Sequence, residues 1–72
     1  MSGQIKLLDV VALTADLTEK QLLRGQVGTV VETLAAAVFE VEFSDDQGRA
    51  YATAAVRADQ MMVLHYRPEQ AA

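Results

Sequence analysis

The chain has 72 residues, of which 51% are apolar and 22% charged, and its formal net charge is −4. This length allows one small hydrophobic core, and the apolar fraction is too high for a disordered chain. The absence of cysteine excludes disulfides, thiolate metal sites and cysteine nucleophiles, and ten acids against six bases disfavour a nucleic-acid partner, because phosphate backbones repel an acidic domain.

The first third of the chain predicts one strand followed by a long loop. Residues 7–13 carry β-branched side chains in the middle of a run that is too short for a confident helix. Residues 14–24 are mostly polar and predict an irregular excursion, with one helical turn after Thr18, whose hydroxyl is expected to cap that turn. The leucines of this loop are expected to fold back over one end of the core.

Two glycines then stand three residues apart, directly before a second strand. Glycine adopts positive φ and lets another backbone approach closely. The segment 24–32 therefore predicts a tight turn that feeds a strongly twisted strand, with Gly28 at positive φ or beneath a crossing strand. This strand is expected to run to about Leu34, and residues 35–37 are expected to form the hairpin loop. The alternative is one short helical turn over Thr33 to Val38, because alanine favours helix.

The clearest pattern lies in residues 38–43, where Phe39, Val41 and Phe43 alternate with Glu40 and Glu42. Period-two alternation predicts a strand with one buried face and one face in water.

Turn-forming residues follow in residues 44–49, with Gly48 suited to a left-handed position, and the extended pattern resumes over 50–56. A 3₁₀ turn is expected over 57–60 and a brief closing strand over 61–64. Residues 1–4 and 68–72 are expected to be frayed tails. These elements predict an all-β fold: a single domain over residues 1–72, built as a small five-stranded SH3-like barrel with a long loop after the first strand.

Two resemblances agree with this fold. The segment Arg-Gly-Gln-Val-Gly-Thr-Val-Val-Glu at 24–32, followed by Phe-Glu-Val-Glu-Phe at 39–43, resembles the KOW-type segment of SH3-like barrels in ribosomal and transcription factors. Those contexts are usually basic, whereas this chain is acidic.

The succession of segments from Ile5 to Pro68 is also similar to a family of small bacterial proteins, common in cyanobacteria, that is described only as a domain of unknown function. This resemblance implies the barrel and a bacterial origin, and it lends no catalytic residue. Such proteins are often stand-alone chains, sometimes encoded beside another small protein, which implies a partner-binding or antitoxin-like role.

Few residues suggest chemistry. His65 is the one histidine, so a catalytic or metal role would lack the further ligands or the orienting carboxylate that such a role needs. Asp45 and Asp46 lack the ligand spacing of a calcium loop and predict a turn. Glu40 and Glu42 share one face of a strand, with Glu32 expected across from them, and we interpret them as a solvated patch available to a partner.

We therefore expect a non-enzymatic protein-interaction module or small accessory subunit, without cofactor or metal, in the cytoplasm and with no membrane span. It is expected to bind an unidentified protein partner, and one possibility is that it neutralises the other member of a two-protein pair. Its exposed strand edges also allow a homodimer. The alternative is an RNA- or ribosome-associated KOW-like barrel that contacts phosphate through Arg24, Arg49 and Arg57. The expected structural glycines are Gly25, Gly28 and Gly48, and the candidate partner surface comprises Arg24, Glu40, Glu42, His65, Tyr66 and Arg67.

Overall fold

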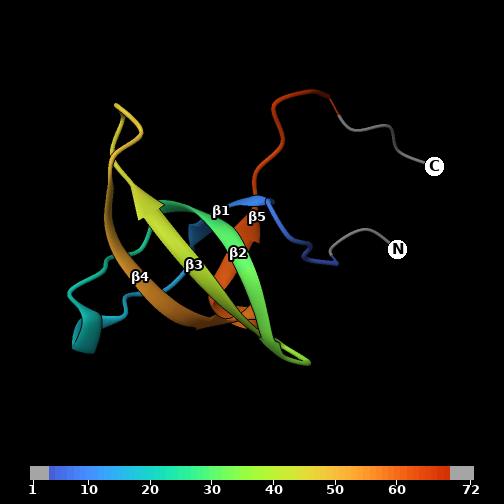
Figure 1. The fold of residues 1–72 in the computed structure, drawn as a ribbon, viewed down its shortest axis with the longest axis horizontal. Helices are drawn as coiled ribbons and strands as arrows, with labels where there is room; N and C mark the ends of the chain where they lie inside the picture. Colours follow the sequence, from blue (N-terminus) through green and yellow to red (C-terminus); the bar gives the residue numbers. More distant parts are fainter. Residues whose placement is uncertain (1–3, 69–72) are drawn as a thin grey trace.

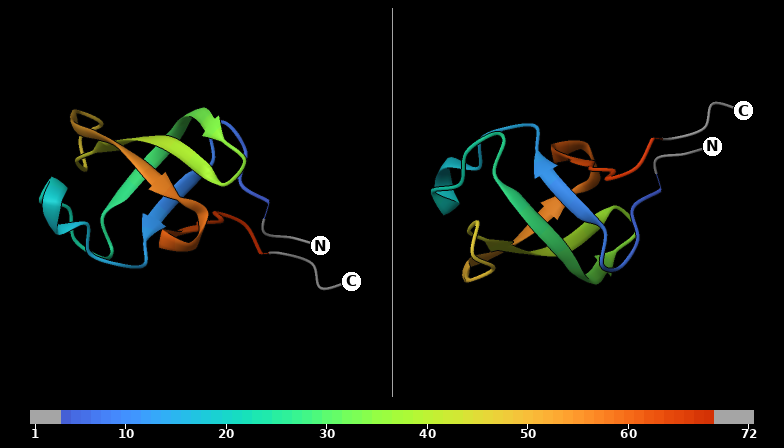
Figure 2. Two further views of the ribbon diagram at one scale, coloured as in Figure 1. Left: turned by 90° about the horizontal axis from the view of Figure 1, so that it is seen from below. Right: turned by 90° about the horizontal axis from the view of Figure 1, so that it is seen from above.

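The structure is a computed structural model that describes residues 4–68, and the outermost residues of both predicted tails lie outside this range. Figure 1 shows its elements, which are β1 (Val10–Leu13), η1 (Thr18–Lys20), β2 (Val27–Ala35), β3 (Val38–Ser44), β4 (Ala50–Arg57), η2 (Ala58–Gln60) and β5 (Met61–Val63). The strands form one antiparallel sheet in the order β4-β3-β2-β1-β5. This confirms the predicted all-β class, and the curled sheet in Figure 2 is compatible with a small SH3-like barrel.

Strand β2 connects the two halves of the sheet. Its first residues pair with β1, where Gly28 lies opposite Val11, and almost its whole length pairs with β3, where Gly28 lies opposite Phe43. The β2–β3 register shifts between Val30 and Glu32 and again further along the strand. Such irregularities bend a strand and increase its twist, so a single strand can serve both halves of a curled sheet.

Gly28 is fixed by this close packing. A Cβ atom at Gly28 would lie 2.6 Å from Cγ1 of Val41 and 2.8 Å from the carbonyl oxygen of Glu42. Its φ is not positive, so of the two arrangements expected at this position, the structure has the one in which a neighbouring strand covers the glycine. Gly25 and Gly48 differ from it, because both adopt positive φ, at 94° and 81°, in open space.

The core follows the alternation predicted for β3. Phe39, Val41 and Phe43 are buried, whereas Glu42 is exposed and Glu40 is half-buried. These three side chains pack with inward-facing residues from every other strand and from the long loop: Val11, Leu13, Leu22, Val30, Ala54, Val56 and Met61. Met61 is buried and Met62 is exposed, as the alternation of adjacent strand residues requires.

The loop between β1 and β2 is attached to the core by one of its leucines. Leu22 is 2% exposed and lies in the core cluster, Leu17 packs against that cluster, and the backbone amides and carbonyls of these two residues bond to each other. Leu23 is 57% exposed, so the expectation that the loop leucines cover the core is wrong for this residue. The predicted cap is also wrong: η1 starts at Thr18 itself, after Leu17, and has no side-chain cap hydrogen bond.

The first strand is shorter than predicted. Residues 7–9 precede β1, and Leu8 has a φ of 71°, which a strand does not allow. The Asp9 carboxylate accepts a hydrogen bond from the amide of Lys6 at 2.8 Å, and the Asp9 amide donates to the Lys6 carbonyl at 3.1 Å. This local turn competes successfully with the β-propensity of the leucines.

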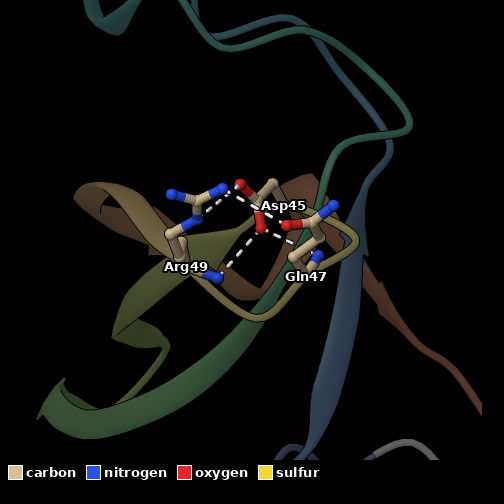
Figure 3. A network of polar contacts seen from close by, with 3 residues as sticks. All are labelled: Asp45, Gln47 and Arg49. Atoms are coloured by element: carbon tan, nitrogen blue, oxygen red, sulfur yellow. Dashed lines mark hydrogen bonds and ion pairs between the residues drawn. The ribbon is translucent and has the colours of Figure 1, made fainter.

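The turn between β3 and β4 is organised by Asp45, as Figure 3 shows. Its Oδ1 accepts hydrogen bonds from the backbone amides of Gln47 and Arg49, both at 2.9 Å, and the amide of Gly48 donates to the Asp45 carbonyl at 3.0 Å. Aspartate commonly stabilises turns in this way. The Asp45 carboxylate therefore closes a turn, as the sequence predicts.

Gly28→Ala is expected to lower the free energy of unfolding by about 2 kcal/mol, because the new methyl group must displace Val41 and the β3 backbone. For a domain of this size the loss corresponds to a fall in Tm of about 10 °C. Thermal unfolding followed by circular dichroism measures it, with Gly48→Asn as the control, since asparagine tolerates the left-handed region. A melting curve that Gly28→Ala leaves unchanged would contradict the β2–β3 packing.

Leu22→Ala and Leu23→Ala test how the long loop is attached. The first removes a buried side chain and is expected to cost about 2–5 kcal/mol, whereas the second removes an exposed one and is expected to cost about 0.5 kcal/mol or less. Urea unfolding of both variants measures the difference. Equal losses would mean that the loop does not contribute Leu22 to the core.

Candidate functional site

The candidate partner residues fall into three separate places. Arg24 lies in the β1–β2 loop, Glu40 and Glu42 lie on β3, and residues 65–67 follow β5. Strands β2 and β1 separate β3 from β5 in the sheet, and Figures 1 and 2 show the η1 loop and the segment after β5 at opposite ends of the molecule. The structure therefore does not bring these residues into one surface.

Arg24 is held through its backbone and presents its side chain to solvent. Its amide donates a 2.8 Å hydrogen bond to Oδ1 of Asp16, which ties the two sides of the loop together. His65, Tyr66 and Arg67 are all exposed, and Tyr66 is among the most exposed large side chains described.

The acidic residues form a defined geometric arrangement. Glu32 on β2 lies directly opposite Glu40 on β3, and Glu42, two positions along β3, lies opposite Thr29. Directly opposed residues place their Cβ atoms about 5 Å apart, and neighbours two positions along one strand share the same face. We call Glu32, Glu40 and Glu42 the acidic row.

No lysine or arginine among residues 4–68 forms an ion pair with the acidic row. The ion pairs found among residues 4–68 are local ones, with Arg49 Nε lying 3.9 Å from Asp45 and Arg57 Nε lying 3.2 Å from Asp59. On the far side of β3, the register neighbours of Glu40 and Glu42 on β4 are Ala55 and Thr53. Like charges directly opposite each other destabilise a sheet, so the row is an electrostatic cost to the isolated chain.

The described residues offer little other chemistry. Within residues 4–68 no group of three or more histidine, aspartate and glutamate side chains is placed to hold a metal ion, and every side chain in the described core is apolar. None of the helical turns in the described range is long and apolar enough to cross a membrane. The acidic row can attract positively charged groups of another molecule by Coulomb forces.

The family model described as a domain of unknown function, DUF4926, matches residues 7–63. The chain belongs to this family. The matched residues run from the turn before β1 to the end of β5, so they include the whole sheet of this chain.

Comparison with curated proteins and with solved structures gave no match. The description of DUF4926 names no activity. The function of this member is therefore argued from its surface.

Sequence reasoning missed the exposed turn before β1. Leu7 and Leu8 were assigned to a strand, yet both are strongly exposed and the backbone of Leu8 is left-handed. One signal was present: Asp9 stands three residues after Lys6, a spacing at which an aspartate accepts a backbone amide and closes a turn.

Glu40→Gln is expected to raise the free energy of unfolding by about 0.5 kcal/mol, because it removes repulsion with Glu32 across the strands and with Glu42 along β3. Glu19→Gln is the control, since it changes the net charge equally at an exposed position in η1. Urea unfolding at low salt measures both. The gain should shrink when salt screens the carboxylates; equal effects from the two variants would contradict a specific repulsion in the row.

Proposed function

We propose that this member of DUF4926 is a non-enzymatic protein-interaction module that binds a basic surface of another protein through the acidic row. It would serve as a small accessory subunit or as the neutralising member of a two-protein pair. The observation that carries the proposal is the direct opposition of Glu32 and Glu40, neither of which takes part in the ion pairs described among residues 4–68. A lysine or arginine from a partner would remove this repulsion on binding.

The surroundings of the row suit such a contact. Glu32 and Glu42 are exposed, and the residues directly opposite Glu42 and Glu40 on the flanking strands, Thr29, Thr53 and Ala55, are uncharged and short. Arg57 lies two positions along β4 from Ala55 and is paired with Asp59. Strand pairing on both sides of β3 fixes the backbone that carries Glu40 and Glu42, so no backbone ordering is needed when a partner docks. Complementary charges of this kind speed association and fix orientation more than they add affinity.

The RNA-binding alternative, based on the KOW-like segment at 24–32, has less support. Two of its three arginines, Arg49 and Arg57, lie beside the carboxylates of Asp45 and Asp59. Phosphate would have to replace those carboxylates, and it would also be repelled by the acidic row. Retention on RNA at low salt, lost on Arg24→Gln, would favour this alternative.

Co-purification from the native host tests the proposal. The tagged chain is expected to retain a basic protein at about 50 mM salt and to release it at about 500 mM, because salt screens exposed charges. Glu40→Gln/Glu42→Gln is expected to reduce retention about tenfold, which corresponds to two lost charge pairs of about 0.7 kcal/mol each.

The matched control is Glu19→Gln/Asp46→Asn, which removes the same charge from exposed positions in η1 and in the β3–β4 turn. This variant is expected to retain the partner fully. A chain that emerges alone under gentle conditions, or equal loss from both double variants, would refute the acidic row as the binding surface.

A further inference from the structure

Strand β4 leaves one edge of the sheet open. It pairs with β3 on one side and stands last in the sheet order, so no other strand of the described range lies on its second side (Figure 1). In an antiparallel ladder, alternate residues direct their amides and carbonyls toward the neighbouring strand and away from it. Among residues 4–68, no backbone–backbone hydrogen bond outside the ladders uses an amide or carbonyl of residues 50–56. The outward groups of β4 are therefore open to a further strand.

This open edge lacks the features by which proteins commonly prevent strand pairing. Those features are charged side chains, prolines, bulges and very short edge strands. From Ala50 to Val56, β4 carries no charged residue and no proline, and its register with β3 is regular from Ala52 to Arg57. The strand has 8 residues, whereas β5 at the opposite edge has 3. The length, regularity and composition of β4 thus suit pairing with an extended segment.

The open edge also lies beside the acidic row. Ala55 is directly opposite Glu40, and Thr53 is directly opposite Glu42, so these pairs share the outer face of the sheet. Ala55 and Thr53 are both exposed and have short side chains. A strand added to β4 would lie about 10 Å from β3, which is two strand spacings. Lysine or arginine side chains on that strand can extend their stems across the short side chains and place their charged ends at the carboxylates of the row.

We propose that the open edge of β4 binds an extended segment of the partner protein as an added strand, and that this segment carries lysine or arginine at alternate positions. The inference rests on the proposed function and specifies the form of its partner. Alternate residues of a strand lie on one face, and Glu40 and Glu42 are likewise two positions apart. Backbone pairing contributes the affinity that exposed charge pairs alone do not provide, and the charges select the sequence of the segment.

Charge favours a basic segment of another protein over a second copy of this chain. The one basic residue of β4 is Arg57, whose Nε lies 3.2 Å from Asp59. Two copies joined edge to edge through β4 would bring two acidic rows onto one continuous sheet, with no further positive charge from either β4 strand, and each chain has a net charge of −4. A segment without basic residues would leave the repulsion between Glu32 and Glu40 in place.

Amide hydrogen exchange of the isotope-labelled full chain, followed by NMR with a synthetic peptide, tests the inference. The probe is a peptide of about nine residues, the length of a long strand, in which lysine alternates with threonine. This peptide is expected to slow the exchange of the outward β4 amides about tenfold, because strand pairing protects them. The amides of β5, at the edge remote from β3, are expected to exchange as before.

Two further peptides separate the role of the backbone from that of the charges. The first has the same sequence with every backbone amide N-methylated, so it keeps the charges but cannot donate to β4. The second has glutamine in place of each lysine, so it keeps the backbone donors but lacks the charges. Both are expected to bind about tenfold more weakly than the lysine peptide at low salt and to leave the outward β4 amides unprotected at the same concentration.

Ala55→Lys changes the edge within the chain itself. Ala55 is exposed and opposite Glu40, so the lysine keeps the fold, pairs with the row and places a charge on the edge. The affinity for the lysine peptide is expected to fall about tenfold. Ala36→Lys is the matched control, because it changes the net charge equally at an exposed position between β2 and β3 and should leave the affinity within about twofold.

Three results would overturn the inference. The first is that the lysine peptide does not bind at concentrations up to about 1 mM. The second is equal binding of the lysine and N-methylated peptides with no protection of β4, which would exclude strand addition while leaving a charge-based contact with the acidic row. The third is equal protection by the lysine and glutamine peptides, which would exclude selection by the row. The proposed function fails by a different result, the equal retention of both double variants in the co-purification.

Discussion

The close approach of β3 to Gly28 is the constraint on which the rest of the structure depends. With no Cβ at this position, Val41 and the Glu42 carbonyl pack directly over the β2 backbone, and β2 still pairs with β1 on its other side. One strand thereby belongs to both halves of a curled sheet. A chain of this length could not cover the edges of a flat sheet, so this packing gives it a closed core.

The same strand supplies part of the surface from which function is inferred. Beyond Gly28, β2 carries Glu32 into register with Glu40, and the carbonyl of its Val30 accepts the amide of Leu8 in the turn before β1. Both features carry a cost in the isolated chain: opposed carboxylates in one, a left-handed leucine in the other. We propose that basic groups of a partner protein relieve the first of these costs by meeting the acidic row.

Much of the fold could be predicted from the sequence because its signals are local. The alternation around Val41 identifies a half-buried strand, and Gly48 with Asp45 identifies a turn whose hydrogen bonds lie within five residues. The sequence also predicts that Glu32 lies across from Glu40 and Glu42. The exact register, with Glu32 directly opposite Glu40, depends on a register shift in β2 that no local sequence pattern predicts.

What could not be predicted depends on contacts between distant segments. Leu22 and Leu23 are adjacent residues of the same type, and only the way the loop packs on the sheet decides which one enters the core. Leu8 lies in a run that predicts a strand, yet it precedes β1. Its amide donates to the carbonyl of Val30 on β2, and its backbone is left-handed. A surface hollow likewise joins residues from the N-terminal segment, the β2–β3 hairpin and η2.

The most direct test of this account is a nuclear Overhauser measurement on the isotope-labelled chain, read at the Hα protons of Gly28. The β2–β3 packing predicts strong cross-peaks from these protons to a γ-methyl group of Val41 and to the ring of Phe43, because atoms of both side chains lie next to the position of the missing Cβ. Cross-peaks to neither residue, or to side chains of a strand other than β3, would contradict the β2–β3 register that places Glu32 opposite Glu40.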